Sequence, residues 1–259
     1  MNGRWWRSAA LFALALSAVW ATRASAQTSE VKEKPRMYSY VAFWALPRAQ
    51  WANEAKLEMD DRKILDKSLA DGKLIGYGDD TVLVHQPDGA THDDWFSSMS
   101  LAGLLDVLDQ FYKSPDITSP VEASATKHWD SILVTRFYNW HAGSWKDAYT
   151  YVASYKFKPD APEDGLETLC KGAIVPIMEK LLADGTILEY EVDTEAIHTD
   201  APGTFYIAYL APNAESLDKV GAAIRESFKS NPLHGPAFDS MLDYSSHRDY
   251  LVRTNATYK

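Results

Sequence analysis

Two patterns of apolar residues alternate along the first half of the chain. Residues 38–45 alternate in polarity and are rich in aromatic and β-branched side chains, which predicts a strand. Residues 50–70 have apolar side chains mainly at three- and four-residue steps, which predicts a helix. The same criteria predict four further elements: a strand over 73–85, a strand over 94–100, a helix over 101–112 and a strand over 129–138. The predicted order is β-α-β-β-α-β.

Short signals mark where these helices begin and end. Ser100 precedes the second helix and is expected to be its N-cap, and Asn213 is expected to do the same later in the chain. Gly72 and Gly185 stand just after helical segments, where a residue in the left-handed conformation commonly ends a helix.

The second half of the chain repeats the first. Residues 64–85 align without a gap with residues 177–198, and ten of the twenty-two positions are identical. Two further matches follow in the same order, 38–42 with 149–153 and 128–133 with 247–252. Three ordered matches indicate an internal duplication. The predicted units are 37–139 and 148–258, joined through residues 141–145.

A β-α-β-β-α-β unit is the ferredoxin-like arrangement. Two such units in tandem resemble the dimeric α/β-barrel superfamily. That group includes antibiotic-biosynthesis-type monooxygenases, EthD-like and NIPSNAP-like proteins, and haem proteins like chlorite dismutase and the dye-decolorising peroxidases. The resemblance implies an α+β fold in which two sheets pack face to face, as an intramolecular pseudo-dimer, around a cavity. No motif specific to one family occurs, so the resemblance implies no particular activity.

The first residues have the features of a secretory signal peptide. Arg4 and Arg7 precede an apolar stretch over 9–21, and Ala24-Ser25-Ala26 supplies small residues for cleavage. The prediction is a signal peptide over 1–26 and a polar linker over 27–36, with export to the periplasm or the medium. A retained membrane anchor is the alternative.

Charge and cysteine content narrow the choice of partners. Removing residues 1–26 takes away three arginines and no acid, which changes the net charge from −10 to −13. Such a chain repels nucleic acid and anionic lipid, so we expect a small-molecule ligand, and homo-oligomerisation stays open. Cys170 is the only cysteine. It aligns with Leu57, which favours a buried apolar role over that of a nucleophile.

The third predicted element has two distinct faces. Tyrosine, threonine and histidine recur on one face in both copies: Tyr77, Thr81 and His85, then Tyr190, Thr194 and His198. Together with Tyr40 and Tyr151 of the preceding strands, we expect the tyrosines and threonines to bind a ligand in the shared cavity, with His85 and His198 as candidate catalytic residues. The alternative is that these tyrosines are core residues. The opposite face is acidic or small: Gly76, Gly78 and Asp80, then Glu189, Glu191 and Asp193.

A histidine and an aspartate recur two residues apart on the last strand of each unit. They are His128 with Asp130 and His247 with Asp249, which makes each pair a candidate general base. Because duplicated positions tend to belong to the scaffold, the structural interpretation of these pairs is favoured.

Other chemistry is less well supported. His85, His92, Asp93 and Asp94 suggest a metal site, but Thr204 and Phe205 stand at the corresponding place in the second unit, so no metal is predicted. His141, His234 and His247 could ligate haem, yet none lies in a haem motif, so haem is not predicted and the cofactor stays unknown. The overall prediction is an exported small-molecule-binding protein, with cofactor-independent oxygenase, isomerase or lyase as candidate activities. The alternative is a non-catalytic periplasmic binding or scaffold protein.

Overall fold

The computed structural model describes residues 33–86, 89–114, 119–199 and 202–259. The predicted signal peptide, most of the predicted linker and residues 87–88, 115–118 and 200–201 lie outside these residues. Among the described residues, no helix combines the length and the apolar character needed to cross a membrane.

Eight antiparallel strands form a closed barrel in the described part of the chain. They are β1 (Met37–Ala45), β2 (Gly76–Val82), β3 (His92–Ser98), β4 (Lys127–Trp140), β5 (Ser144–Phe157), β6 (Glu189–Glu195), β7 (Thr204–Ala211) and β8 (Leu242–Tyr258). Their order around the barrel is β1-β3-β2-β8-β5-β7-β6-β4. Each half of the chain thus supplies four adjacent strands, and the halves join where β2 pairs with β8 and β4 with β6.

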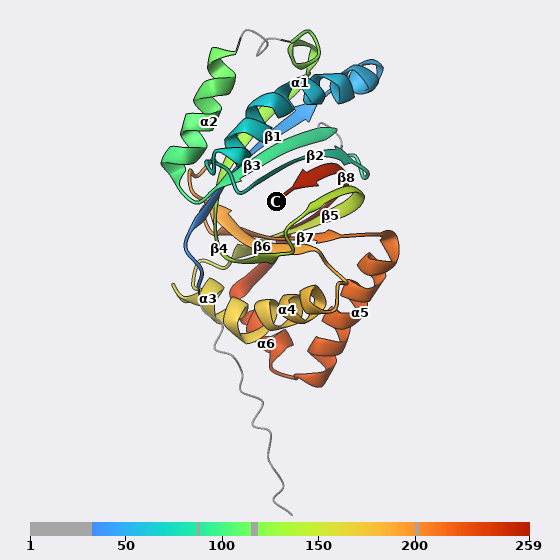
Figure 1. Ribbon diagram of the computed structural model, residues 1–259. Coiled ribbons are helices and arrows are strands. Elements are labelled where there is room, and N and C mark those ends of the chain that lie inside the picture. Colours follow the sequence, from blue (N-terminus) through green and yellow to red (C-terminus); the bar gives the residue numbers. More distant parts are fainter. Residues whose placement is uncertain (1–32, 87–88, 115–118, 200–201) are drawn as a thin grey trace, which may run out of the picture. The chain divides into compact units, whose positions relative to one another are not determined.

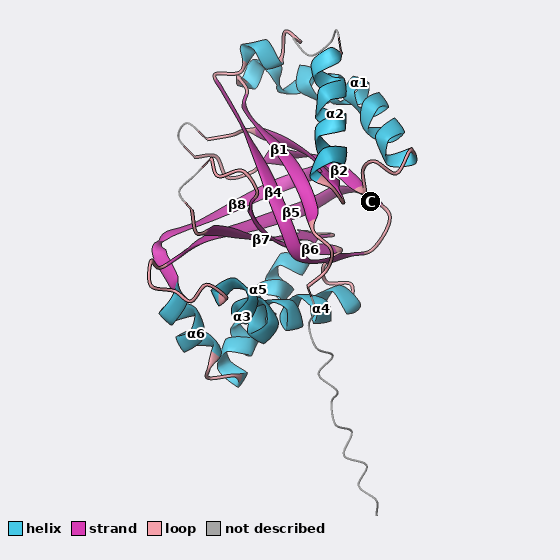
Figure 2. Ribbon diagram, turned by 90° about the vertical axis from the view of Figure 1, so that its left-hand side faces the viewer, coloured by secondary structure: helices cyan, strands magenta, loops and turns pink. Residues whose placement is uncertain are grey.

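Helices cover the barrel on two opposite sides (Figures 1 and 2). The first half supplies α1 (Trp51–Ala70) and α2 (Leu101–Lys113). The second half supplies α3 (Gly165–Leu169), α4 (Val175–Ala183), α5 (Ala214–Ser230) and α6 (His234–Met241). Two short turns precede α1 and β4, at Arg48–Gln50 and Glu122–Ser124, and a π-helical turn, Cys170–Ile174, connects α3 to α4.

Each helix layer has its own apolar core against the outer face of the strands. In the first half, Leu104 and Val107 of α2 pack with Tyr77 and Phe96 of the sheet. In the second half, Leu181 and Leu182 of α4 pack in a larger cluster that also includes the buried Cys170. The strands therefore have two covered faces, one under the helices and one inside the barrel.

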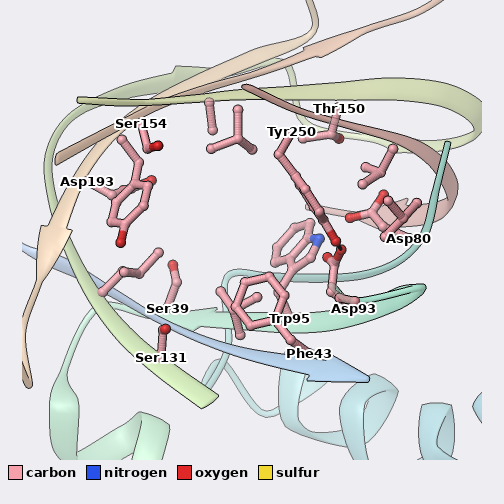
Figure 3. A pocket seen from close by; sticks show the side chains of 18 of the residues that line it. Ser39, Phe43, Asp80, Asp93, Trp95, Ser131, Thr150, Ser154, Asp193 and Tyr250 are labelled. Carbon is pink, nitrogen blue, oxygen red and sulfur yellow. Dashed lines mark hydrogen bonds between the residues drawn. The ribbon is translucent and has the colours of Figure 1, made fainter. Parts of the chain in front are cut away.

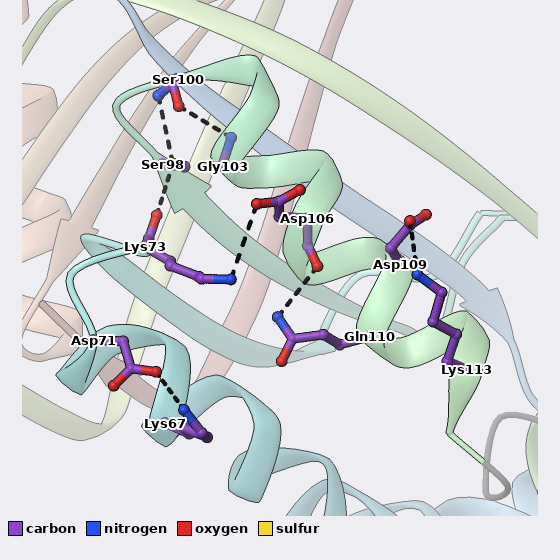
Figure 4. Close-up of polar contacts among 10 residues, drawn as sticks. All are labelled: Lys67, Asp71, Lys73, Ser98, Ser100, Gly103, Asp106, Asp109, Gln110 and Lys113. Carbon is purple, nitrogen blue, oxygen red and sulfur yellow. Dashed lines mark hydrogen bonds and ion pairs between the residues drawn. The ribbon is translucent and has the colours of Figure 1, made fainter.

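The two predicted N-caps and the two predicted glycine stops are confirmed. The hydroxyl of Ser100 accepts a hydrogen bond from the Gly103 amide at 3.0 Å (Figure 4), and the side chain of Asn213 accepts one from the Ser216 amide at 3.0 Å. Gly72 and Gly185 follow α1 and α4 with φ of 71° and 74°. Residues with a Cβ rarely adopt this conformation, which explains glycine at both helix ends.

Strand boundaries differ from the prediction by several residues. The strand predicted over 73–85 is limited to Gly76–Val82, and the strand predicted over 94–100 begins at His92 and ends at Ser98. Pairing sets these limits, because β3 lies between β1 and β2 and pairs with both. The repeat pattern also did not predict α6, which the second half adds before β8.

Candidate functional site

A cavity of about 1020 Å³ lies inside the barrel, between the strands of the two halves. This barrel cavity is lined by alternate residues of all eight strands, as Figure 3 shows for side chains from both halves. Most of its wall is apolar or aromatic, including Val41, Trp95 and Tyr250. Its charged lining residues are Asp80, Asp93, Asp130, Glu189, Glu191, Asp193, Arg248 and Asp249.

The expected cavity therefore exists, but the face assigned to it was wrong. Tyr77 and Tyr190 are each only 1 % exposed and belong to the cores under the helices. Tyr40 and Tyr151 also pack on the outer faces, whereas Asp80 lines the cavity. Both faces of these strands are covered, so a mixture of polar and apolar residues on one face does not tell which side it occupies.

The two predicted threonines and the two predicted histidines are also not in the barrel cavity. The Thr81 hydroxyl bonds to the amide group of Asn255, and the Thr194 hydroxyl donates to the carbonyl of Val134 at 3.4 Å. His85 and His198 follow the ends of β2 and β6 and are exposed. Their placement in the cavity wall was therefore wrong.

A second pocket, of about 390 Å³, lies between the first-half strands and their helices. We call it the sheet–helix pocket. Its floor is the outer face of β1, β2, β3 and the start of β4, and its roof is formed by α1 and α2. The lining residues that carry polar groups or aromatic rings are Tyr40, Trp44, Arg62, Tyr77, Asp79, Asp94, Trp95, Phe96, Phe111, Tyr112, Ser114, Glu122, His128 and Asp130. The pocket thus brings together four of the predicted site residues, Tyr40, Tyr77, His128 and Asp130.

A chain of hydrogen bonds runs along one end of this pocket. The Tyr40 hydroxyl donates to Oδ1 of Asp130 at 2.7 Å, and the same oxygen lies 3.2 Å from Nε2 of His128. Nδ1 of His128 lies 3.1 Å from the carbonyl oxygen of Phe43, and its ring stacks on Trp44 at 3.7 Å between centroids. Burial, and then the bond to Asp130, raise the pKa of Tyr40, so its hydroxyl stays protonated.

The second half contains the same chain of groups. His247 lies 3.3 Å from Asp249 and 2.9 Å from the carbonyl oxygen of Ser154, and it stacks on Tyr155. Burial and a hydrogen bond to Asp249 raise the pKa of Tyr151. This duplication supports a scaffold role for the tyrosine–aspartate–histidine arrangement.

An ion pair distinguishes the first-half pocket from its counterpart. Nη2 of Arg62 lies 3.0 Å from Oδ1 of Asp79, while the buried Oδ2 of Asp79 has no hydrogen-bond partner among the described residues. Asp94 lines the same pocket. The repeat alignment and the strand register place Val175, Val192 and Ile207 at the positions of Arg62, Asp79 and Asp94. Those three aliphatic side chains are buried in the second-half core, so this charged set occurs in one copy only.

The residues considered for metal or haem have other roles in the fold. His92 is buried with Nε2 3.7 Å from Glu54, and burial lowers its pKa to about 4. A ring nitrogen of His141 faces the Leu182 carbonyl oxygen at 2.9 Å, and His234 bonds to Ser227 and Asn231. Among the described residues, no group of three or more His, Cys, Asp or Glu side chains is arranged to hold a metal ion.

Cys170 occupies the π-helical turn and is fully buried, as its alignment with Leu57 predicted. Burial raises the pKa of its thiol to about 12, which removes the thiolate that a nucleophile needs.

Sequence reasoning did not propose Arg62, Asp79 or four of the acids inside the barrel, Asp80, Glu189, Glu191 and Asp193, as site residues. A signal for the acids was present, because residues 76–80 and 189–193 place Asp80, Glu189, Glu191 and Asp193 on one face. Arg62 had no such signal, since its partner Asp79 lies on a different element.

Comparison with known proteins finds similarity in structure only. No family model and no curated protein matches the sequence. A protein from Lactobacillus acidophilus NCFM, described as a "putative monooxygenase", superposes with a TM-score of 0.63 at 12 % identity, covering 87 % of this chain and 97 % of that one. A protein of the same description from Fusobacterium nucleatum gives 0.59 at 9 % identity, covering 86 % and 94 %.

A variant of chlorite dismutase from Candidatus Nitrospira defluvii gives a TM-score of 0.51 at 10 % identity, covering 84 % of this chain and 91 % of that one. Identities this low report on the fold and not on the reaction. The chain therefore has the fold of the dimeric α/β-barrel superfamily.

Proposed function

We propose that the protein binds a small molecule in the sheet–helix pocket of its first half. The observation that carries this proposal is the charged set of Arg62, Asp79 and Asp94, which one copy has and the other replaces by buried aliphatic residues. A partly buried ion pair is often less favourable than the aliphatic side chains that take its place in the other copy, and Oδ2 of Asp79 is buried without a hydrogen-bond partner among the described residues, so the fold alone gives little reason to keep this set. A binding function in that copy supplies the reason.

We also infer that the two halves are tandem ferredoxin-like units forming an intramolecular pseudo-dimer. The strand order β4-β1-β3-β2 in the first half corresponds to β8-β5-β7-β6 in the second. The positive-φ glycines and the tyrosine–aspartate–histidine chains occupy equivalent places in the two halves. These correspondences support a duplication whose copies later diverged.

The ligand that fits the pocket is a flat aromatic molecule with a hydroxyl group. Tyr40, Phe96 and Phe111 form a continuous aromatic surface, with centroid separations of 5.1 Å and 5.9 Å. The unpartnered Oδ2 of Asp79 can accept a hydrogen bond from the hydroxyl group of a ligand. The Arg62 guanidinium beside Asp79 would stabilise negative charge on the oxygen of that hydroxyl group. A volume of about 390 Å³ lies within the range of small-molecule sites.

The candidate activities begin with removal of a proton from the substrate. An isomerase, a lyase and a cofactor-independent oxygenase share this first step, and Asp130 with His128 at the end of the pocket is the candidate base. The similarity to proteins described as monooxygenases is consistent with the oxygenase among these. No cofactor is part of the proposal.

The second candidate function is binding without catalysis. It is favoured by the contacts of His128, whose two ring nitrogens face a carboxylate and a carbonyl oxygen, as those of His247 do in the other half. Both ring nitrogens thus already face protein acceptor groups, which leaves neither nitrogen directed at a substrate.

Ligand binding is tested with a matched pair of probes. We expect 1-naphthol, which has a hydroxyl donor, to bind more tightly than 1-methoxynaphthalene, which lacks it. Arg62→Gln should weaken 1-naphthol binding by about tenfold, because a charge-assisted contact is lost. Arg136→Gln, which removes a surface pair with Glu33, is the control and should leave binding unchanged. Equal binding of both probes, or no effect of Arg62→Gln, contradicts the proposal.

The two candidate functions are separated by equivalent substitutions in the two halves. If the aspartates are scaffold only, Asp130→Asn and Asp249→Asn should each lower the free energy of unfolding by about 1 kcal/mol without changing the turnover of any bound substrate. If Asp130 acts as a base, only Asp130→Asn should abolish turnover. Mass spectrometry of small molecules released from the purified protein would supply the substrate candidates.

We further propose that the protein is exported after cleavage following Ala26. The basic residues, apolar stretch and small residues of positions 1–26 support this. N-terminal sequencing of protein from a periplasmic or culture fraction should begin at Gln27. Recovery of intact Met1 in a membrane fraction would show a retained anchor instead.

A further inference from the structure

The barrel cavity lies on the inner face of the strands and the sheet–helix pocket on the outer face, with Trp95 and Asp130 lining both, and the acids of the cavity include two pairs of carboxyl groups. Glu189 and Glu191 lie on β6, and Asp80 on β2 faces Asp93 on β3 in register. The side chains of exposed residues, including Val84, Gln86 and Arg248, line part of this cavity, so it is open to solvent there.

The first carboxyl pair is neutralised by the chain itself. Nζ of Lys259, which is fully buried, contacts Glu189 and lies 2.6 Å from Glu191. The same ammonium lies 5.1 Å and 4.9 Å from the ring centroids of Trp95 and Trp140. One end of the cavity thus shows the chemistry of ammonium recognition, in which carboxylates and indole rings surround a buried cation.

The second carboxyl pair has no cation among the described residues. Asp80 is 2 % exposed and Asp93 is 5 % exposed, and neither pairs with a cationic side chain in the part of the chain that the structure describes. Oδ2 of Asp93 accepts a hydrogen bond from the Tyr250 hydroxyl at 2.8 Å. Among the described residues, Oδ1 of Asp80 is buried without a hydrogen-bond partner, although the Asp80 carboxyl group also forms hydrogen bonds with Thr254 and Asp93. Figure 3 shows both carboxyl groups beside Tyr250 at the cavity wall.

The second pair is also particular to one half of the barrel. Asp80 corresponds to Asp193 in the repeat, but the strand register places Tyr206 at the position of Asp93. The scaffold therefore requires one aspartate at this place, and the first half adds a second acid beside it. Two adjacent buried carboxyls repel each other when both are ionised, and burial raises the pKa of Asp93 to about 7, with Asp94 and Asp79 adding repulsion.

The surroundings of the pair suit an organic body and not a metal ion. Phe43, Trp129 and Tyr250 form an aromatic group, with Phe43 stacked on Trp129 at 5.4 Å and edge-on to Tyr250 at 6.3 Å. Val82 and Val252 add aliphatic surface. A divalent metal needs more oxygen ligands than two carboxyl groups supply, and no group of three or more His, Cys, Asp or Glu side chains among the described residues is arranged to hold one.

We propose that the barrel cavity binds an organic ammonium ion, a primary or secondary amine with an apolar body, whose N–H groups bind Asp80 and Asp93. The ammonium donates to the otherwise unpartnered Oδ1 of Asp80 and to Asp93, while the body of the ligand lies against the aromatic group of Phe43, Trp129 and Tyr250. This site does not depend on the function proposed for the sheet–helix pocket.

The test is calorimetric titration of the full mature chain with two amines and their neutral twins. The probes are tryptamine with tryptophol, and hexylamine with hexanol, and each twin has a hydroxyl in place of the ammonium. At least one amine should bind about tenfold or more tightly than its twin. Calcium chloride should not displace the bound amine. Failure of both amines to bind, equal binding of the twins, or displacement by calcium overturns the proposal.

Variants locate the site. Asp80→Asn and Asp93→Asn, made separately, should each weaken the bound amine by about tenfold or more. Asp193→Asn, the equivalent acid of the other half, and Arg62→Gln in the sheet–helix pocket should leave amine affinity within about twofold. The melting temperature checks that each variant folds. Weakening by Asp193→Asn equal to that by Asp80→Asn would show general attraction to the acidic interior and overturn the assignment.

Proton release gives an independent readout that needs no variant. The amine stays charged over the range tested, so binding favours the ionised carboxyl and drives a proton off the pair. Affinity should therefore rise as the pH goes from about 6 to about 8, and the heat of binding at pH about 6 should depend on the ionisation enthalpy of the buffer. Affinity independent of pH over this range contradicts binding at Asp80 and Asp93.

Discussion

At the scale of single residues, the protein places charge where an ordinary core would be apolar. Asp80, Asp93 and Asp193 are all less than a tenth exposed, and burial raises the pKa of each carboxyl. Thr135 donates to Asp193, and Tyr250 donates to Asp93. These hydrogen bonds offset part of the free energy that burial costs but leave the acids easier to protonate than in water.

The raised pKa of Asp93 predicts how stability depends on pH. Its folded pKa of about 7 lies above the unfolded value of about 3.9, so its contribution to stability is complete below the unfolded pKa and is lost as the pH rises through the folded one. Asp93→Asn should therefore stabilise the fold at pH about 8, by roughly 1 kcal/mol or more, and change little at pH about 4. Urea unfolding at both pH values measures the effect.

Asp109 provides the control for this experiment. It is an exposed residue of α2 that pairs with Lys113 at 3.1 Å (Figure 4), so Asp109→Asn should not produce a gain in stability at high pH. The prediction is contradicted if wild-type stability rises steadily from pH about 5 to about 8 and Asp93→Asn leaves that rise unaltered. Such a result would mean that the pKa of Asp93 is not raised.

At the scale of elements, the two halves use the same local devices to position different chemistry. The helices that precede β2 and β6 both end at a glycine with positive φ. On the outer face of each of these strands, a tyrosine donates a hydrogen bond to an acidic residue of the helix that precedes the strand. These are Tyr77 with Asp66 and Tyr190 with Glu179. The shared devices keep the framework constant, so Arg62 and Asp79 can differ from their counterparts without changing the elements that hold them.

The equivalence of the two helix ends leads to a prediction about glycine substitution. Gly72→Ala and Gly185→Ala should each destabilise the protein by about 1 kcal/mol, because alanine is strained at positive φ. The added methyl group would meet no heavy atom within 4 Å at either site, so backbone strain is the only cost. Equilibrium unfolding in urea measures both variants.

Gly172, in the π-helical turn, is the matched control. An added Cβ there also meets no atom within 4 Å, but its φ is not positive. Gly172→Ala should therefore be neutral or slightly stabilising. Equal destabilisation by all three substitutions would mean that conformation is not the cause.

At the scale of the whole molecule, barrel closure makes the two halves depend on each other. β2 of the first half pairs with β8, and β4 pairs with β6, so neither half has a free sheet edge at these joins. Lys259 follows β8 and exchanges backbone hydrogen bonds with Gly143 at 2.9 Å in both directions. Its ammonium contacts Glu189 and Glu191 of β6 inside the closed structure.

The buried Lys259 predicts a large loss of stability when its charge is removed. The glutamates raise the pKa of Lys259 despite its burial, so it is charged and balances them. Lys259→Met would leave buried acids without a cation and should cost about 3–5 kcal/mol in the free energy of unfolding. The triple variant that adds Glu189→Gln and Glu191→Gln should recover most of this loss. Lys146→Met, at an exposed position, should have little effect.

From the sequence alone, the repeat between the two halves, the order of the strands and of the helices other than α6, both glycine helix stops, both N-caps and the burial of Cys170 could be predicted. These features are local, or they recur in two copies, so each depends on a few neighbouring residues whose preferences act within one turn or one strand. The fold class followed from them because few arrangements bury the apolar faces of two β-α-β-β-α-β units.

The face of each strand that lines the barrel could be assigned only from the packing of the folded chain. Both faces are covered, one by helices and one by the opposite strands, so the alternation of Tyr77 and Asp80 had no solvent side to orient it. The pairing of Asp80 with Asp93, of Arg62 with Asp79, and of Lys259 with Glu189 joins separate elements, and it depends on strand register and on the packing of helices and strands. Side chains that act together in this protein are therefore brought together by contacts between elements that no short stretch of sequence contains.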